Sequence, residues 1–190
     1  MTSVQSSAAV ALYCSGKCPG SVVLRALDVA VALREAPVWL ASGFHSSVER
    51  ECLALLLKGT VRLTVCPARS AVGMRVPAAW KPAIEVGRLT IRSAIDEGFE
   101  VDRDLGDPKP TARRPTATLA EHRNRFVASI SDGVLILHAS PRGKLDRLAG
   151  ELAAASKPLW ILEDPANQHL IERGARPVTP ATIDSIWAEA

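Results

Sequence analysis

Short apolar runs alternate with amphipathic segments along most of this chain. Residues 8–14 form one continuous apolar run, and residues 133–138 form another. Such a run, without polar residues at every second position, is typical of a strand that is buried on both faces of a sheet. Between these runs apolar side chains recur at helical spacing, as at Val23, Leu27 and Ala30. The alternation therefore predicts repeated strand–helix–strand units.

The order of the predicted elements defines a fold class. We expect strands at residues 8–14, 38–41, 61–66, 89–91, 133–138 and 158–162. We expect helices at residues 22–35, 46–58, from 116 or 118 to about 129, 142–156 and 167–173, with a closing segment at 182–190. Strand–helix–strand connections are right-handed crossovers, so the sheet should be mainly parallel with helices on both faces. This is a doubly wound, Rossmann-like α/β domain.

The length suits a single domain. The chain has 190 residues, enough for one sizeable core and little room for two, so we expect one domain over residues 1–190 with its core at about 8–178. Residues 96–115 show no period and contain several glycines and prolines. We expect a long irregular loop there, and in a compact domain such a loop is usually functional or disordered.

Charge and composition exclude several classes of protein. The net charge of +3 is too small to identify a nucleic-acid-binding protein by itself, so the distribution of charge has to decide. No run of eighteen apolar residues is present, and the N-terminus lacks the basic region of a signal peptide, so we expect a cytoplasmic protein without a membrane span.

The cysteines are expected to be reduced thiols. Cys14 and Cys18 have the spacing C-x₃-C, but there is no second pair and no histidine nearby, and Cys52 and Cys66 stand alone. A zinc site needs four such ligands. We therefore expect neither a metal nor another cofactor.

Doubly wound sheets bind ligands beyond the carboxyl ends of their strands, where the strand order reverses. The first loop at this edge contains Ser15, Gly16 and Lys17, between a strand and a helix. Backbone N–H groups at a helix start, together with a lysine, suit an anion. A simple tight turn explains the same residues equally well.

Two further loops belong to the same edge. Ser42, Gly43 and Phe44 follow the second strand, and glycine allows close approach of the backbone to a ligand. Ser46 or Ser47 is expected to cap the helix that follows, which explains the serines without a ligand. Past the strand at 133–138, the candidate binding residues are Arg142, Gly143 and Lys144.

The most informative stretch is Arg123-Asn124-Arg125, just before the strongest strand signal. Guanidinium groups are planar, permanently charged forks that suit phosphate oxygens, and an asparagine can bind a ribose or a base edge. Further basic residues lie in the preceding loop and in the segment after the strand. Scattered arginines usually form only a solvated basic face, but this placement favours a site for an anionic ligand.

Three stretches resemble the DNA-processing protein A (DprA/Smf) family. Residues 38–44 resemble its V-V-S-G-x-x-x-G-I-D segment, residues 122–137 its F-x-x-R-N-R-I-I-A-x-L-S-D-x-V-V-V-V, and residues 170–175 its N-x-L-I-x-x-G-A. The order and spacing of the three agree over residues 8–178. The resemblance implies a Rossmann-like fold shared with the LOG and lysine-decarboxylase-like proteins. It further implies binding of single-stranded DNA without catalysis, loading of a recombinase, and a homodimer, with Ser42, Gly43, Arg123, Asn124 and Arg125 in the site.

The chain also departs from the family pattern. Phe44 to Glu49 replace the family's A-R-G-I-D, and the P-G-G-x-G-T-x-x-E sequence of phosphoribohydrolases is absent. We therefore expect a divergent, stand-alone core domain whose partner is single-stranded DNA or, alternatively, a nucleotide or nucleotide derivative that the protein senses or carries. A third hypothesis is a nucleoside monophosphate hydrolase. Glu49 and Glu121 are the only acidic residues well placed to take part in such a reaction.

Overall fold

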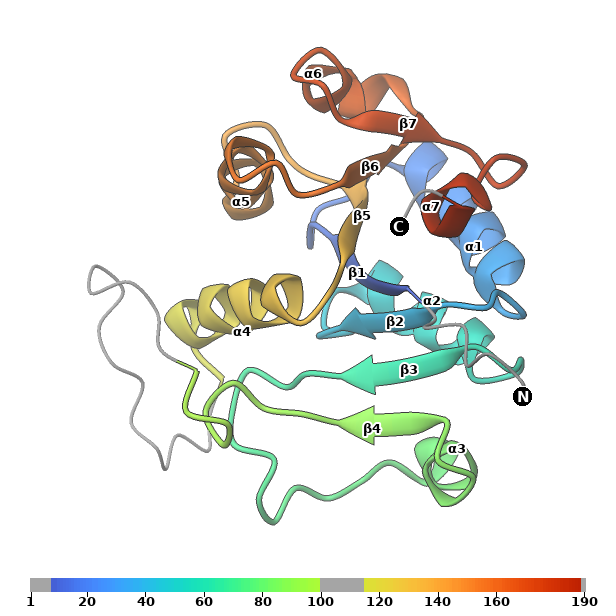
Figure 1. Ribbon diagram of the computed structural model, residues 1–190, viewed down its shortest axis with the longest axis vertical. Helices are drawn as coiled ribbons and strands as arrows, with labels where there is room; N and C mark the ends of the chain where they lie inside the picture. The colour runs from blue at the N-terminus through green and yellow to red at the C-terminus, as the bar shows by residue number, and fades with distance from the viewer. Residues whose placement is uncertain (1–7, 100–114, 189–190) are drawn as a thin grey trace, which may run out of the picture.

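The structure, a computed structural model, describes residues 8–99 and 115–188 of the chain. Seven strands form one parallel sheet in the order β4-β3-β2-β1-β5-β6-β7, and Figure 1 shows them in this order from bottom to top. The strands are β1 (Ala9–Cys14), β2 (Trp39–Ser42), β3 (Arg62–Val65), β4 (Leu89–Ile91), β5 (Gly133–His138), β6 (Leu159–Leu162) and β7 (Arg176–Val178). The order reverses between β1 and β5, which places the switch point there.

Helices cover both faces of the sheet. The helices are α1 (Gly20–Leu33), α2 (Ser47–Leu56), α3 (Lys81–Glu85), α4 (Ala117–Ser129), α5 (Lys144–Ala154), α6 (Gln168–Ile171) and α7 (Ser185–Ala188), with 3₁₀ turns η1 (Ala78–Trp80) and η3 (Pro165–Asn167). One apolar core packs α1, α2 and α7 against one face, and a second packs α4, α5 and α6 against the other. The predicted Rossmann-like class, with a parallel sheet between two helical layers, is confirmed.

Buried strand residues alternate between the two cores because successive side chains point to opposite faces. Leu135 and Leu137 of β5 belong to the first core, while Val134 and Ile136 belong to the second. All six residues of β5 are buried, as expected for a central strand of a parallel sheet. The continuous apolar run at residues 133–138 therefore reflects burial of β5 on both faces of the sheet.

The structure corrects three details of the expected fold. A short edge strand, β7, and the short helix α3 were not predicted. The core extends beyond residue 178, since Ile183 and Ile186 pack into the first core. The loop expected at residues 96–115 lies largely outside the described residues, which resume at residue 115.

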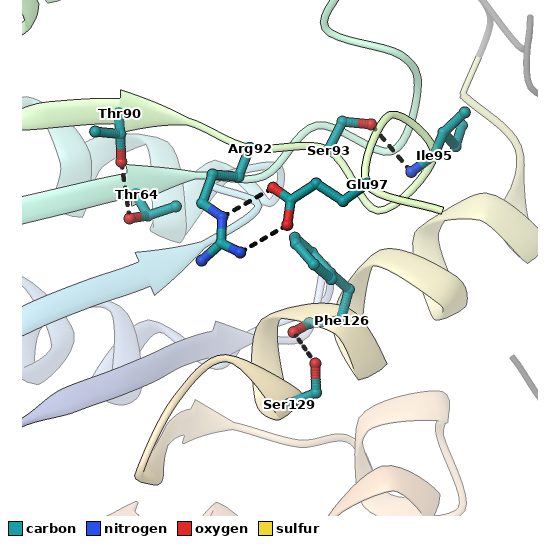
Figure 2. Close-up of polar contacts among 8 residues, drawn as sticks. All are labelled: Thr64, Thr90, Arg92, Ser93, Ile95, Glu97, Phe126 and Ser129. Atoms are coloured by element: carbon teal, nitrogen blue, oxygen red, sulfur yellow. Dashed lines mark hydrogen bonds and ion pairs between the residues drawn. The ribbon is translucent and has the colours of Figure 1, made fainter. Parts of the chain in front are cut away.

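Polar contacts surround the end of β4, in addition to its apolar packing (Figure 2). The hydroxyls of Thr64 and Thr90 lie 3.1 Å apart on neighbouring strands, and Arg92 forms a two-pronged ion pair with Glu97 at 2.6 and 2.8 Å. The Arg92 guanidinium also lies 5.4 Å from the centre of the Phe126 ring of α4. The contact between Arg92 and Phe126 joins α4 to the segment after β4.

Candidate functional site

Two loops meet at the switch point between β1 and β5. The Ser15 N–H donates to the His138 carbonyl at 2.8 Å, and the Ser15 hydroxyl accepts from the Ser140 N–H at 3.1 Å. Ser15 therefore ties the two loops together, while Gly16 and Lys17 stay exposed beside it. Pro19 precedes α1 without a side-chain cap, so the first N–H groups of that helix have no side-chain acceptor.

Arg123 reaches from α4 across the carboxyl edge of the sheet. It is only 6% exposed, and its Nη1 donates to the Cys66 carbonyl just past β3 at 3.2 Å. A Cβ atom added to Gly43 would lie 1.4 Å from that Nη1. Gly43 is therefore the residue that makes room for the guanidinium of Arg123, whereas the close approach predicted from the sequence was to a ligand.

Asn124 orients its neighbour. Its Oδ1 accepts from Nε of Arg123 at 2.8 Å, and its carbonyl accepts from the Tyr13 hydroxyl at 2.6 Å. Burial raises the pKa of Tyr13 well above its ordinary value, and the nearby Arg123 charge only partly opposes the rise. The phenol therefore stays a proton donor at neutral pH and fixes α4 to β1.

Glu49 organises the loop after β2. Its side chain is 5% exposed and accepts from the backbone N–H groups of Cys14, His45 and Ser46 at 2.8, 2.7 and 3.0 Å. Ser46 caps α2 and completes a capping box with Glu49. It is one of the two serines that were predicted to cap this helix. Both oxygens of Glu49 are occupied, so this carboxylate positions backbone rather than waiting to transfer a proton.

The predicted cations divide into paired and unpaired groups. Arg125 pairs with Glu151 of α5 at 2.9 Å, and Lys144 pairs with Glu121 of α4 at 2.5 Å. Arg123 and Arg125 are two residues apart on a helix and so project about 200° apart. The two guanidinium groups, which were predicted to serve one site, therefore have different partners. Arg125 joins α4 to α5, far from the Gly43 contact.

Lys17, Arg123 and Arg142 form the unpaired group, which we call the edge cations. None of them has an ion pair with any residue that the structure describes. The side chain of Arg142 is exposed in the loop after β5, and only its backbone N–H contacts Asp146, donating to the carboxylate at 2.7 Å. All three come from loops or helix faces at the carboxyl edge, where a Rossmann-like sheet binds its ligand.

Two non-glycine site residues adopt left-handed backbone. Phe44 has φ of 44° and Arg142 has φ of 59°. Such conformations cost about 1–3 kcal/mol and persist only where the surroundings impose them. The Phe44 N–H donates to the Ser42 hydroxyl at 3.1 Å, which explains the buried serine. In the other loop Gly143 is required by packing, because an added Cβ would lie 2.8 Å from the Ser140 carbonyl.

Two polar side chains at this edge lie outside the predicted set of binding residues. Arg69 follows β3 in the loop over residues 67–75, which was singled out without naming a residue. Asn167 is fully buried; it contacts His138 at 2.8 Å and donates to the Leu137 and Leu162 carbonyls, so it holds the ends of β5 and β6 together. Only the family resemblance pointed to Asn167, because its partners are far apart in sequence.

The thiols of Cys14, Cys52 and Cys66 are buried and protonated. Burial raises the pKa of Cys52 and of Cys66 to about 12, and it raises the pKa of Cys14 further still. Among residues 8–99 and 115–188, no cluster of three His, Cys, Asp or Glu side chains is placed to hold a metal ion. In the same part of the chain, no helix is long and apolar enough to cross a membrane.

These features define the class of protein: a three-layer, Rossmann-like domain with unpaired cations at the carboxyl edge of its sheet. Its fold is that of DprA. The structure of DNA processing protein A from Streptococcus pneumoniae matches with a TM-score of 0.70 at 16% identity, over 96% of this chain and 62% of that one. DNA processing protein A from Helicobacter pylori is described as having a unique single-stranded DNA binding mode. Its structure matches with a TM-score of 0.68 at 18% identity, over 96% of this chain and 81% of that one.

A further structure shares the fold more loosely. The molybdenum cofactor carrier protein from Chlamydomonas reinhardtii matches with a TM-score of 0.54 at 12% identity, over 95% of each chain. No protein-family model matches the sequence, and no curated protein matches it either. The chain spans 62% of the length of the S. pneumoniae protein, so the likeness establishes the fold of this region.

Proposed function

We propose that this protein binds single-stranded DNA at the carboxyl edge of its sheet, mainly through phosphate contacts, and without catalysis. The observation that carries the proposal is Arg123: a nearly buried guanidinium that no described carboxylate neutralises. A buried charge is costly unless it is paired, so an anion at this edge would supply the missing partner. The DprA fold, found in a protein described as binding single-stranded DNA, gives the anion its chemical class.

The edge cations suit a phosphate backbone better than a base. Arg123 is already oriented by Asn124 and by the Cys66 carbonyl, so little side-chain entropy is lost when it meets a phosphate. Lys17 and Arg142 are exposed on either side of the switch point and can follow a flexible strand. Glu49 and Glu121 are both engaged in backbone or ion-pair contacts, so neither supports a hydrolase.

The test compares oligonucleotide and mononucleotide binding by fluorescence anisotropy. We expect wild-type protein to bind oligo-dT, and the double variant Lys17→Ala/Arg142→Ala to bind it at least tenfold more weakly, because two charge-assisted contacts are lost. Arg125→Ala/Arg173→Ala is the matched control, since it also removes two charges, which Glu151 and Asp146 already neutralise. Binding of mononucleotides alone would instead establish a nucleotide sensor or carrier.

The family resemblance extends the proposal to assembly. It includes a homodimer and a recombinase as protein partner. Sedimentation velocity over a range of concentrations tests the dimer, and co-sedimentation of a recombinase with the DNA complex tests the partner. A monomer at every concentration would remove self-association from the proposal while leaving DNA binding in place.

A further inference from the structure

A groove lies between α2 and η1, on the face of the sheet opposite α4. Its apolar lining is formed by Phe44, Leu53, Leu57 and Trp80, and Arg50 and Lys58 are exposed along it. We call it the α2 groove. Its volume is about 520 Å³, which is within the range of sites that take a small organic group such as a nucleobase.

The charge around the α2 groove has a single sign. On the other side of η1 a second hollow of about 350 Å³ is lined by Arg75 and Lys81, both exposed. Among the described residues, no acidic side chain lines either hollow. Lys58, Arg75 and Lys81 also form no ion pair with any described residue. Cations that border an apolar surface without carboxylates complement a polyanion that carries flat apolar groups.

The α2 groove reaches the loop after β2, which lies at the carboxyl edge of the sheet. Phe44 lines one end of it and directly follows Gly43, on which the Arg123 guanidinium packs. The groove extends along α2 as far as Lys58, just past the end of a ten-residue helix that is about 15 Å long. A strand bound at the edge cations therefore has an open path along α2.

Trp80 is the aromatic side chain best placed for stacking in this groove. It is partly exposed, whereas Phe44 is 5% exposed and belongs to the apolar core. Stacking on an aromatic ring suits any base, because every base has a π-face. The groove thus offers base contacts that the edge cations lack.

We infer that the α2 groove binds bases of single-stranded DNA that leaves the edge cations, with Trp80 as the stacking platform and Lys58 and Lys81 contacting phosphates. This inference rests on the proposed DNA binding and adds a second segment to the site. It accounts for three features together: the apolar lining, the one-signed charge, and the contact of the groove with the loop at Gly43.

The test measures binding of a short and a long oligo-dT, of about four and roughly twelve nucleotides. Lys58→Ala/Lys81→Ala should weaken the long oligonucleotide about tenfold and leave the short one unchanged, since the short one is held by the edge cations. Arg62→Ala is the matched control, because Arg62 is exposed at the start of β3 outside the groove. Quenching of tryptophan emission by the long oligonucleotide should be largely lost in Trp80→Phe, which keeps an aromatic ring for folding.

The outcomes separate this inference from the proposed function. Normal binding of the long oligonucleotide by the double variant, with loss in Lys17→Ala/Arg142→Ala, would overturn the groove and keep the DNA site. No binding of either oligonucleotide by wild-type protein would overturn both. A change in oligomer size in Trp80→Phe, with unaltered DNA affinity, would show that a second copy of the chain occupies the groove and would also overturn the inference.

Discussion

Gly43 and Arg123 act as a pair at the scale of single residues. The glycine leaves the space that the guanidinium fills, and the guanidinium in turn reaches the Cys66 carbonyl across the strand ends. The sequence does not reveal this contact, since eighty positions separate the two residues. The contact places one positive charge where the ligand of a doubly wound sheet is expected.

Substitution of this glycine should damage both stability and binding. In Gly43→Ala the new Cβ would overlap Nη1 of Arg123, so the guanidinium must move. We expect a loss of about 1–3 kcal/mol in the free energy of unfolding and at least tenfold weaker oligonucleotide binding. Gly150→Ala on α5 is the matched control, because nothing lies within 4 Å of its added Cβ and it belongs to neither binding surface. Urea unfolding and anisotropy titration measure the two effects, and equal behaviour of the two variants would contradict the assigned contact.

His122 gives the fold a pH dependence. Burial lowers the pKa of His122 below its ordinary value of 6.5, and its Nε2 lies 2.7 Å from the Phe99 carbonyl. Below about pH 6.5 the unfolded chain therefore binds more protons than the folded one. The free energy of unfolding should fall on acidification, by at most about 1.4 kcal/mol per pH unit from this group.

Chemical denaturation between pH 7 and pH 5 tests that expectation. His122→Gln should lose less stability over this range than wild-type protein. His45→Gln should behave like wild type, because His45 is exposed. An identical pH dependence for all three proteins would assign the acid sensitivity to other groups.

At the scale of elements, α2 is joined to β1 by one carboxylate. Pairing of β1 with β2 ends at Ala11, and the Cys14 N–H beyond it donates to Glu49 instead of to a strand. The same side chain accepts from two N–H groups before α2. Glu49 thus holds together the end of the switch strand, the Gly43 loop and the start of the helix.

Replacing this carboxylate should cost stability. In Glu49→Gln an amide N–H₂ would face backbone donors, and one acceptor oxygen would remain for three N–H groups. We expect the free energy of unfolding to fall by about 2–3 kcal/mol. Glu51→Gln on the exposed side of α2 should stay within about 0.5 kcal/mol of wild type. Urea denaturation compares the two, and a small effect at Glu49 would mean that the capping box contributes little.

At the scale of the whole molecule, the net charge of +3 conceals a local pattern. Arg125, Lys144 and Arg173 are neutralised by carboxylates on α4 or α5, while the edge cations pair with no carboxylate in the part of the chain that the structure describes. A flexible polyanion would therefore be attracted to one edge rather than to the whole surface. Attraction of this kind weakens as salt screens it.

The salt dependence of DNA binding should report the number of edge contacts. Three phosphate contacts predict a slope of about −2 for log K against log salt concentration with the short oligonucleotide, which the edge cations alone hold. Lys17→Ala should make the slope shallower by about 0.7, and Arg125→Ala should leave it unchanged. Anisotropy titrations at several salt concentrations measure it. A slope near zero would exclude phosphate as the main ligand group.

The sequence by itself determined the class of the fold. Continuous apolar runs such as β5, separated by helical periods, are enough to specify a parallel sheet between helices, because burial on both faces leaves no other pattern. Ser46, one of the two serines expected to cap the helix after the second strand, was also identified from local rules. β7 was missed because a three-residue edge strand that contains Pro177 has no period to detect.

Only the tertiary structure decided which charges belong to the candidate site. Arg123, Arg125 and Lys144 look alike in sequence, but α4 turns the first toward Gly43 and the second toward Glu151, while Lys144 finds Glu121. The direction in which each side chain leaves α4, and the ion pairs that it forms with distant residues, decide which charges remain unpaired. Both depend on how α4 and α5 pack. Local propensity fixes what each segment becomes, whereas the availability of a charge for a ligand depends on neighbours that the fold brings from elsewhere in the chain.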